Sequence, residues 1–200
     1  MGGSKTTGNS SQQRKAIFLD RDGTIIIDKI YLNDPTQIEY LPGVFETLKE
    51  LKDEGFEFVI VTNQSGVARG IVDIENLYRI HEIIAEDFAK HGIEFLQFYY
   101  APYLVESNHP FRKPNPGMLE QGMKDFNLTS QGSWMIGDRM TDVEAGHRAG
   151  MKSILLTGVE TPDDSEFPEP EAFVDGLPAA KEIILNDLKS SHSPSTSASL

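Results

Sequence analysis

Short apolar runs alternate along the chain with longer segments in which apolar residues recur every three or four positions. Runs of this length are typical of buried strands, and the recurring spacing is typical of helices. The predicted strands are Ala16–Leu19, Glu57–Val61, Phe95–Tyr100, Trp134–Ile136 and Ser153–Leu156. Because strands that alternate with helices need crossover connections, the pattern predicts an α/β fold, a Rossmann-like three-layer sandwich with a mostly parallel central sheet.

Helical spacing is clearest in the segments that follow the first two predicted strands and in two later ones. Apolar residues at 44, 48 and 51 precede Gly55, and a longer run from 77 to 88 precedes Gly92. Glycine directly after such a segment is a common helix end. We therefore expect helices that end near these two glycines, a third over Met118–Phe126, and a last one near Ala179–Leu188.

The two ends of the chain offer little that a core could bury. Residues 1–13 are mostly small or polar, and residues 190–200 are similar, so both segments are expected to be disordered and the folded part to be one domain over 14–189. Within that domain, 24–42 is too long for a simple strand-to-helix turn and carries apolar residues, which predicts a hairpin-like flap. The segment 160–171, rich in Pro, Asp and Glu, predicts an exposed loop.

The composition narrows the possible partners. The 31 acidic and 18 basic residues are spread along the chain and give a formal net charge of −13, which should repel nucleic acid and anionic membranes. The chain has no cysteine, so disulfides, thiol nucleophiles and thiolate metal sites are excluded. No apolar stretch approaches the ~20 residues that span a bilayer, and the N-terminus lacks a secretory pattern. We expect a soluble, cytoplasmic monomer.

Polar motifs follow four of the predicted strands. In a parallel sheet the carboxyl ends of the strands share one edge, and ligands bind beyond that edge. The loops there should therefore come together in space. The motifs are Asp20-Arg-Asp22-Gly-Thr24, Thr62-Asn63-Gln64-Ser65-Gly66, Arg112-Lys113-Pro114, and Gly137-Asp138-Arg139 with Asp142 beyond it.

The two carboxylates of the first motif predict a metal ion. Like charges held this close destabilise one another unless a cation lies between them. Mg²⁺ prefers oxygen ligands and usually takes one or two carboxylates together with carbonyl, water and phosphate oxygens. Asp20, the main-chain carbonyl of Asp22, and Asp138 can supply such a set. Asp142, one helical turn after Asp138, is close enough to hold Lys113 or a metal-bound water.

The same motifs carry the groups that phosphoryl transfer needs. An aspartate can attack phosphorus and form an aspartyl-phosphate, and Asp20 is the candidate. Asp22 can protonate the departing oxygen and then take a proton from water. The Thr62 hydroxyl and the Lys113 ammonium can stabilise the transferring group. Each motif alone has a plainer interpretation as a turn, a helix cap or a solvated lysine; their conjunction favours one reaction.

These motifs resemble those of a known family. Phe18-Leu-Asp20-Arg-Asp22-Gly-Thr24 is similar to the first motif of the haloacid dehalogenase superfamily, and the motifs at Thr62, Arg112-Lys113-Pro114 and Gly137-Asp138 are similar to the other three. The resemblance covers about residues 15–160. Its fuller forms resemble the capless branch that contains D-glycero-D-manno-heptose 1,7-bisphosphate phosphatase and the histidinol-phosphate phosphatase domain, a branch with a small flap after the first strand.

The resemblance implies a role for each motif residue. Asp20 would be the nucleophile, Asp22 the acid and base, and Thr62 and Lys113 the phosphoryl stabilisers, with Mg²⁺ as the cofactor. Asp138 would be a magnesium ligand along with the two motif aspartates. The residues implied to bind substrate are Asp28 and Tyr31 in the flap, Asn63, Gln64 and Ser65 in the second motif, and Arg112 and Arg139.

Three functions remain open at this point. The first is a phosphatase that removes the C7 phosphate of heptose 1,7-bisphosphate, favoured by Arg112 and Arg139, two cations beyond those that the transferred phosphate needs. The second is a histidinol-phosphate phosphatase with the same catalytic residues. The third, from another class, is a non-catalytic phosphosugar-binding protein; retention of both a nucleophile and an acid/base argues against it.

One departure from the branch concerns zinc. Many members carry a structural zinc loop of three cysteines and one histidine before the Arg-Lys-Pro motif. The matching positions here are Ala101, Tyr103, His109 and Phe111, of which His109 alone could bind a metal. We therefore expect no zinc, and the exact substrate becomes less certain because that loop borders the substrate pocket in the branch.

Overall fold

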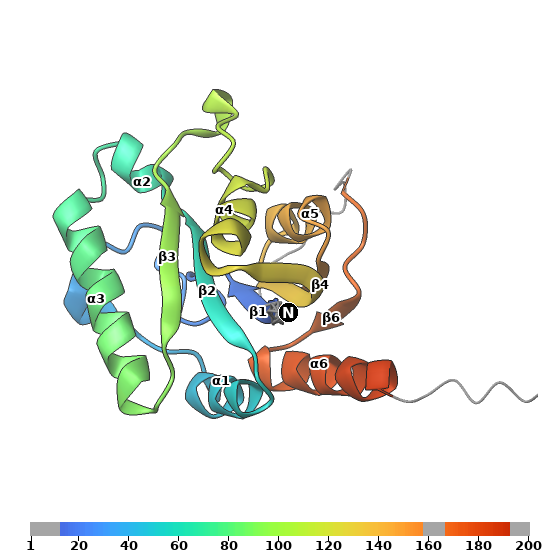
Figure 1. Ribbon diagram of the computed structural model, residues 1–200. Helices are drawn as coiled ribbons and strands as arrows, with labels where there is room; N and C mark the ends of the chain where they lie inside the picture. The colour runs from blue at the N-terminus through green and yellow to red at the C-terminus, as the bar shows by residue number, and fades with distance from the viewer. Residues whose placement is uncertain (1–12, 158–166, 193–200) are drawn as a thin grey trace, which may run out of the picture.

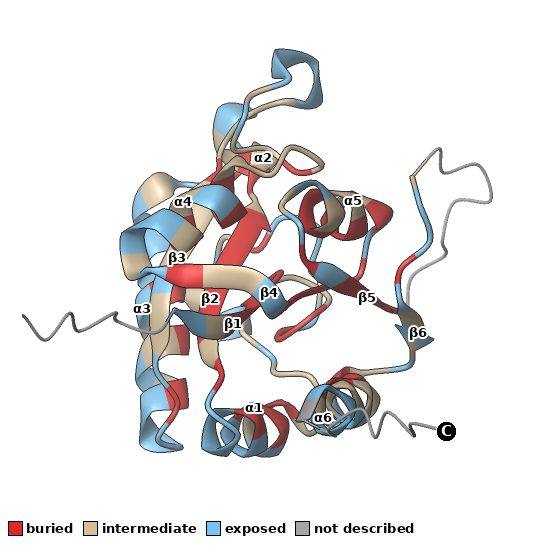
Figure 2. Cartoon of the chain, turned by 45° about the vertical axis from the view of Figure 1, so that its right-hand side comes forward, coloured by how far each residue is buried: buried red, intermediate tan, exposed pale blue. Residues whose placement is uncertain are grey.

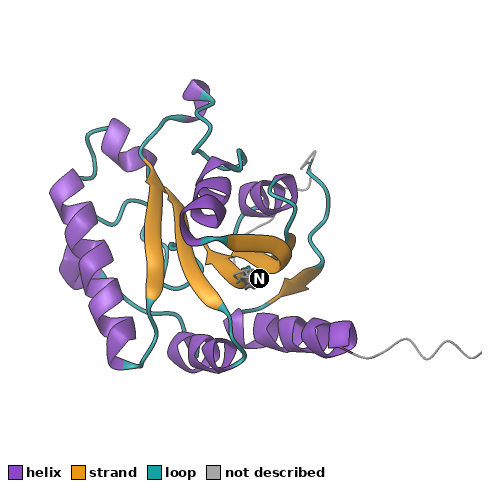
Figure 3. Ribbon diagram, viewed as in Figure 1, coloured by secondary structure: helices purple, strands orange, loops and turns teal. Residues whose placement is uncertain are grey.

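A six-stranded sheet lies between two layers of helices in the computed structural model, which describes residues 13–157 and 167–192 (Figures 1 and 3). The strand order is β3-β2-β1-β4-β5-β6, and each neighbouring pair is parallel. The predicted α/β sandwich is confirmed. The strands are β1 (Arg14–Leu19), β2 (Glu57–Asn63), β3 (Phe95–Ala101), β4 (Leu128–Gly137), β5 (Lys152–Leu156) and β6 (Ala172–Val174).

Two strands differ from the sequence prediction. β4 begins at Leu128, well before Trp134, because Leu128 and Thr129 pair with the start of β1. The register between the two strands then shifts, and Ser130, Gln131 and Gly132 interrupt the apolar pattern that marks a strand. β6 was not predicted, since a three-residue strand at the sheet edge is too short to show a periodicity.

The four helices predicted above are present in the structure, which also contains two further α-helices, α2 and α5. The α-helices are α1 (Val44–Asp53), α2 (Ser65–Ala68), α3 (Ile74–Lys90), α4 (Gly117–Phe126), α5 (Met140–Arg148) and α6 (Leu177–His192). α6 includes residues 190–192, which corrects the expected disorder from Ser190 onward. The hydroxyls of Ser190 and Ser191 donate to main-chain carbonyls one helical turn back, so polar residues extend the helix without an apolar signal.

Two apolar cores lie on opposite faces of the sheet. Alternate residues of β1 divide between them, with Ile17 and Leu19 on the face covered by α1, α3 and α6, and Ala16 and Phe18 on the face covered by α4 and α5. The central strands are buried on both faces (Figure 2). This double burial explains why their sequences are nearly continuous apolar runs.

The predicted flap lies between β1 and α1. The amide of Ile27 donates to the carbonyl of Glu39 at 2.8 Å, and that of Leu41 donates to Ile25 at 3.0 Å, so the two arms of the flap pair as an antiparallel hairpin. The 3₁₀ turn η1 (Pro35–Gln37) lies between the arms.

Some expectations concern residues outside the described part of the chain. They are the disorder of 1–12 and 193–200 and the first part of the exposed loop at 160–171. In the described part of that loop, Pro168, Glu169 and Glu171 are exposed as expected, whereas Pro170 is buried. Among the described helices none is long and apolar enough to span a bilayer.

The strand order sets the position of the site. In the strand order, β2 and β3 lie on one side of β1, whereas β4, β5 and β6 lie on its other side. The order therefore reverses between β1 and β4, and such a switch point opens a crevice at the carboxyl ends of the strands. Asp20 follows β1 there and Asp138 follows β4.

Candidate active site

A cavity of about 280 Å³ lies at this switch point, between the flap and the loops that follow β1, β2, β3 and β4. The predicted site residues line it, with two exceptions. Thr62 and Asp138 are buried behind the lining, with exposed fractions of 1% and 4%. The four predicted motifs therefore do come together in space.

Three aspartates form the group in the described chain that could hold a metal ion. Carboxylate oxygens of Asp20, Asp138 and Asp142 lie within 4.8 Å of one another. Both carboxylate oxygens of Asp138 are buried and have no hydrogen-bond partner among the described residues. A buried carboxylate without a partner is costly, and a cation removes that cost. The donor set of this cluster fits Mg²⁺.

The raised pKa of Asp138 is consistent with a cation site. Burial, followed by the charges of Asp20 and Asp142, raises the pKa of Asp138 to about 7. Gly23 explains how the main chain of the first motif comes so close to it. A β-carbon at Gly23 would lie 2.2 Å from Oδ2 of Asp138, and the φ of Gly23 is +76°. Only glycine fits both the space and the backbone conformation.

Lys113 connects the nucleophile candidate to the metal cluster. Its buried ammonium lies 2.7 Å from Oδ1 of Asp20, 2.6 Å from Oδ1 of Asp142 and 2.7 Å from the Val61 carbonyl. Burial alone would lower the pKa of Lys113, but the charges of Asp142 and Asp20 outweigh it and the pKa is raised. Lys113 is therefore a fixed cation beside Asp20. Of the two roles predicted for Asp142, the structure shows the contact with Lys113.

Opposing effects act on the pKa of Asp20. Burial raises its pKa to about 6, and Asp142 and Asp22 act in the same direction, while Lys113 lowers it. A nucleophile must be ionised to attack. The charge of Lys113, together with any cation at the aspartate cluster, therefore favours the reactive form of Asp20.

Asn63 was predicted to bind substrate, and the structure shows another contact for it. Its side-chain oxygen accepts from the main-chain amide of Lys113, and its side-chain nitrogen donates to the Lys113 carbonyl, both at 3.1 Å. The second motif thus holds the third in place. A direct contact of Asn63 or Ser65 with substrate stays a prediction.

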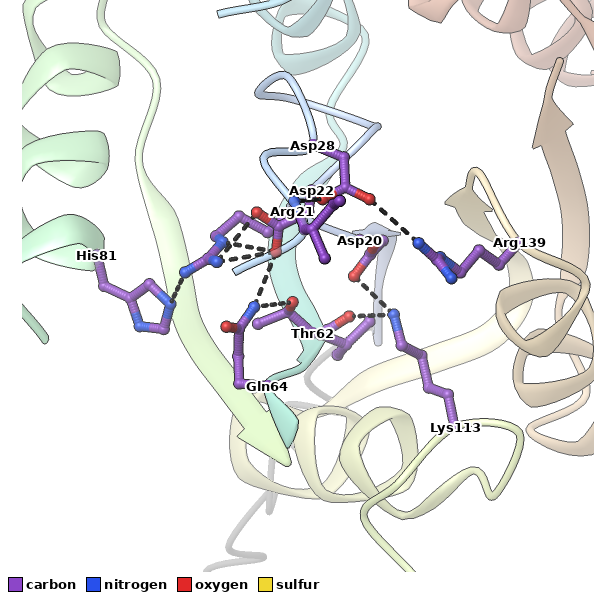
Figure 4. Close-up of polar contacts among 11 residues, drawn as sticks. Asp20, Arg21, Asp22, Asp28, Thr62, Gln64, His81, Lys113 and Arg139 are labelled. Carbon is purple, nitrogen blue, oxygen red and sulfur yellow. Dashed lines mark hydrogen bonds and ion pairs between the residues drawn. The ribbon is translucent and has the colours of Figure 1, made fainter. Parts of the chain in front are cut away.

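The carboxylate of Asp22 accepts hydrogen bonds from two neighbours (Figure 4). Arg21 donates to it through Nε and Nη2, with the shortest contact at 2.8 Å, and Gln64 donates through Nε2 at 2.8 Å. The same Gln64 nitrogen also lies 3.0 Å from the Thr62 hydroxyl. Gln64, which was predicted to bind substrate, therefore joins Asp22 to Thr62.

The predicted substrate-binding arginines lie at the cavity. Arg139 forms an ion pair of 3.1 Å with Asp28, which connects the loop after β4 to the flap (Figure 4). Arg112 donates to the Tyr103 carbonyl at 2.9 Å. Tyr31 also lines the cavity, and its ring lies so close to Gly66 that a β-carbon there would be 2.7 Å from it. The flap therefore packs directly on the second motif.

Aromatic packing occupies the region of the expected zinc-loop positions. The rings of Tyr103 and His109 are stacked with centroids 3.6 Å apart, and His109 meets Phe111 edge-on at 6.0 Å. His109 Nδ1 accepts from the amide of Phe111 at 3.1 Å. This loop is thus held by rings, and it carries the carbonyl that binds Arg112.

Sequence reasoning missed several residues at the site. Ile30 and Thr141 line the cavity, and Arg21 and His81 belong to the hydrogen-bonded group around Asp22. Arg21 had a signal, because an arginine between two aspartates directly after a buried strand has carboxylates within reach. His81 had none, since it is one polar position on an otherwise apolar face of a predicted helix.

Comparisons with known proteins show which family this chain is similar to. A family model described as HAD-hydrolase-like matches residues 110–180. The D-glycero-beta-D-manno-heptose-1,7-bisphosphate 7-phosphatase of Pasteurella multocida is 37% identical over 155 residues, 74% of this chain and 84% of that protein. A D-glycero-alpha-D-manno-heptose-1,7-bisphosphate 7-phosphatase of Photorhabdus laumondii is 33% identical, over 76% of this chain and 88% of that protein.

A solved structure is also similar to this chain. The D,D-heptose 1,7-bisphosphate phosphatase from B. bronchiseptica, in complex with magnesium and phosphate, superposes with a TM-score of 0.78 and 29% identity. The match covers 86% of this chain and 99% of that chain. The similarity therefore extends over most of this chain and nearly all of that one.

Proposed function

Since the chain belongs to the haloacid dehalogenase-like family and is a phosphatase, we propose that it removes the C7 phosphate of a heptose 1,7-bisphosphate through a phosphorylated Asp20. One observation carries the proposal. The buried Asp20 lies against the ammonium of Lys113 and beside Asp138, whose carboxylate oxygens have no partner among the described residues. The fixed ammonium of Lys113 and the unpartnered carboxylate of Asp138, which could bind a cation, suit an attack by Asp20 on a phosphate.

The reaction follows from these positions. Asp20 attacks phosphorus, and the bond from phosphorus to the sugar oxygen breaks with its electron pair on that oxygen. Asp22 donates a proton to the departing oxygen. Asp22 then takes a proton from a water that attacks the aspartyl-phosphate, which releases phosphate and restores Asp20. Lys113 and the Thr62 hydroxyl would stabilise the charge on the transferring group.

Magnesium is the proposed cofactor. Asp20, Asp138 and the Asp22 carbonyl would hold it, and when bound it would neutralise charge on the phosphoryl oxygens and orient them. Asp142, which is paired with Lys113 and accepts from the amide of Arg139 at 3.1 Å, would position the cluster from behind. The magnesium in the B. bronchiseptica structure supports this cofactor.

The substrate proposal rests on cations at the cavity. In a chain with a net charge of −13, Arg112 and Arg139 both line this one pocket in addition to Lys113. A second phosphate or a hydroxyl-rich ring can pair with such donors. Histidinol phosphate carries a cationic amine instead, which these arginines would repel. The curated relatives include enzymes for both anomers, so both anomers belong in the test.

The first experiment is steady-state phosphate release with Mg²⁺ from both heptose 1,7-bisphosphate anomers and from histidinol phosphate, with Asp20→Asn as the blank. We expect one heptose bisphosphate to exceed histidinol phosphate in kcat/KM by ~100-fold and to fall within the usual range of about 10⁴–10⁸ M⁻¹s⁻¹. Rates no higher than the Asp20→Asn blank for the sugars would refute the substrate assignment.

The second experiment tests the arginines. Arg112→Ala should raise KM for the bisphosphate by at least ~10-fold and change KM for a sugar monophosphate much less, because a charge-assisted hydrogen bond contributes roughly 1.5–3 kcal/mol. Arg79→Ala removes an exposed cation that pairs only with glutamates on its own helix in the described contacts and serves as the matched control. Equal losses on both substrates would argue against recognition of a second phosphate.

A further inference from the structure

A buried histidine far from the sequence motifs contacts the acid/base group through one arginine. His81 lies on α3, is 7% exposed, and has its Nε2 3.1 Å from Nη1 of Arg21. Its ring is stacked on Phe98, with centroids 4.9 Å apart and planes at 28°. Arg21 is fully buried, and it has the largest volume among the fully buried side chains of the described residues.

The chemistry of this contact determines the protonation state and the tautomer of His81. A guanidinium has only donors, so Nε2 of His81 must be the acceptor and the ring must be neutral, with its proton on Nδ1. Burial, and then the charge of Arg21, lowers the pKa of His81 to about 3, which agrees with a neutral ring. His81 thus orients one edge of the guanidinium without competing for a proton near neutral pH.

The other edge of the same guanidinium holds Asp22. Nε and Nη2 of Arg21 donate to the two carboxylate oxygens at 2.8 to 3.1 Å, and Gln64 donates from another side (Figure 4). A planar fork transmits orientation well because its nitrogens cannot move independently. The imidazole that fixes Nη1 therefore also fixes where the Asp22 carboxyl lies.

We propose that His81 is a positioning residue for the phosphatase reaction, acting through Arg21 on Asp22. The proposal rests on the proposed function in one respect, the role of Asp22 as the acid that protonates the leaving oxygen. The competing explanation is that His81 merely fills space between α3 and the sheet, where its stacking on Phe98 would be the whole of its contribution.

The two explanations differ in their dependence on the leaving group. When phosphoryl moves to Asp20, an alkyl ester releases a poorly stabilised oxygen that needs the proton of Asp22 as the bond breaks. A 4-nitrophenyl ester releases a stable phenolate that needs no proton. Misplacing Asp22 should therefore slow the alkyl ester selectively, whereas loosened packing should slow both esters alike.

Two substitutions test separately the hydrogen-bond acceptor and the aromatic ring of His81. His81→Phe keeps an aromatic ring on Phe98 but removes the acceptor, and His81→Gln keeps an acceptor oxygen but removes the ring. Ile84→Val, a small change at another buried position of α3, is the control for packing. Asp22→Asn gives the signature of a lost acid. The measured quantity is the ratio of kcat/KM for the heptose 1,7-bisphosphate to that for 4-nitrophenyl phosphate, with Mg²⁺.

We expect His81→Phe to lower this ratio by roughly 10-fold or more, which is part of the roughly 10²–10⁴-fold that acid-base catalysis supplies in full. His81→Gln and Ile84→Val should stay within about three-fold of wild type. An unchanged ratio for His81→Phe, with both esters slowed alike, would overturn the proposal and favour packing. If His81→Phe does not fold, His81→Leu, which also lacks the acceptor, takes its place, and an unchanged ratio for that variant overturns the positioning role.

The design also separates this proposal from the one on which it rests. If Asp22→Asn leaves the ratio unchanged, the acid role of Asp22 is wrong and the positioning role falls with it. If Asp22→Asn lowers the ratio and His81→Phe does not, only the positioning role is wrong. If the heptose ester is not hydrolysed, glycerol 3-phosphate serves as the alkyl ester, because its leaving oxygen needs a proton equally.

Discussion

Replacing Asp138 by asparagine should stabilise the metal-free protein, although it should abolish activity. The pKa of Asp138 is raised from 3.8 to about 7, chiefly by burial and then by Asp20 and Asp142. At about 1.36 kcal/mol per pKa unit, ionising this carboxyl in the folded state costs roughly 4 kcal/mol above pH 7. Asparagine has no charge to bury and can donate to either neighbouring carboxylate.

The pH dependence has a definite sign. Between about pH 4 and pH 7 the unfolded chain has released the Asp138 proton while the folded chain still holds it. The folded state then binds more protons, so stability falls as pH rises through this window and the loss is complete above about pH 7. Asp138→Asn removes this contribution, so its advantage over the wild type should grow across the window, to roughly 2–4 kcal/mol at pH 8.

The assay is urea unfolding in EDTA, followed by the fluorescence of Trp134, the one tryptophan of the chain, which is 2% exposed. Repeating it with Mg²⁺ should narrow the stability advantage of the variant by most of the binding free energy. A ligand at 100 times its Kd adds about 2.7 kcal/mol to the folded wild type, and the variant should gain much less. A variant that is less stable than wild type in EDTA at pH 8, yet gains equally from Mg²⁺, would refute the assignment of Asp138 as a metal ligand.

Three further substitutions test other parts of the site. Lys113→Met should destabilise the protein by roughly 3–5 kcal/mol, because two buried carboxylates lose their shared cation, and calorimetry at pH 7 checks this; acid pH should recover much of the loss, and a deficit independent of pH would contradict the reasoning. Gly23→Ala should cost about 1–3 kcal/mol and weaken Mg²⁺ binding in a calorimetric titration, since the new methyl group meets Asp138 at a positive φ; unchanged affinity would argue against a metal at that carboxylate. His109→Ala should lower stability by about 0.5–1.5 kcal/mol through the lost ring stacking and raise KM with little effect on kcat, whereas a zinc chelator should leave the wild type unchanged; inactivation by that chelator would show that His109 serves a metal.

The sequence determined much of the fold and the chemistry because both depend on local patterns. Apolar runs of strand length marked the five longest strands, and the loops after them carried the residues that line the cavity. The rule that parallel strands present their carboxyl ends at one edge was enough to predict that Asp20, Lys113 and Asp142 lie close together. The structure confirms that grouping.

Only the tertiary structure decided how these groups are held. The contact of His81 with Arg21 joins residues 60 positions apart, and that of Asn63 with Lys113 joins residues 50 apart. No periodicity encodes such pairs, because a hydrogen bond depends on where two elements pack and how each side chain is rotated. The same holds for Gln64, whose amide binds Asp22 and Thr62, and for the aromatic stack at His109. The sequence thus determined which chemical groups reach the site, whereas the packing of helices on the sheet determined which of them hold one another in place.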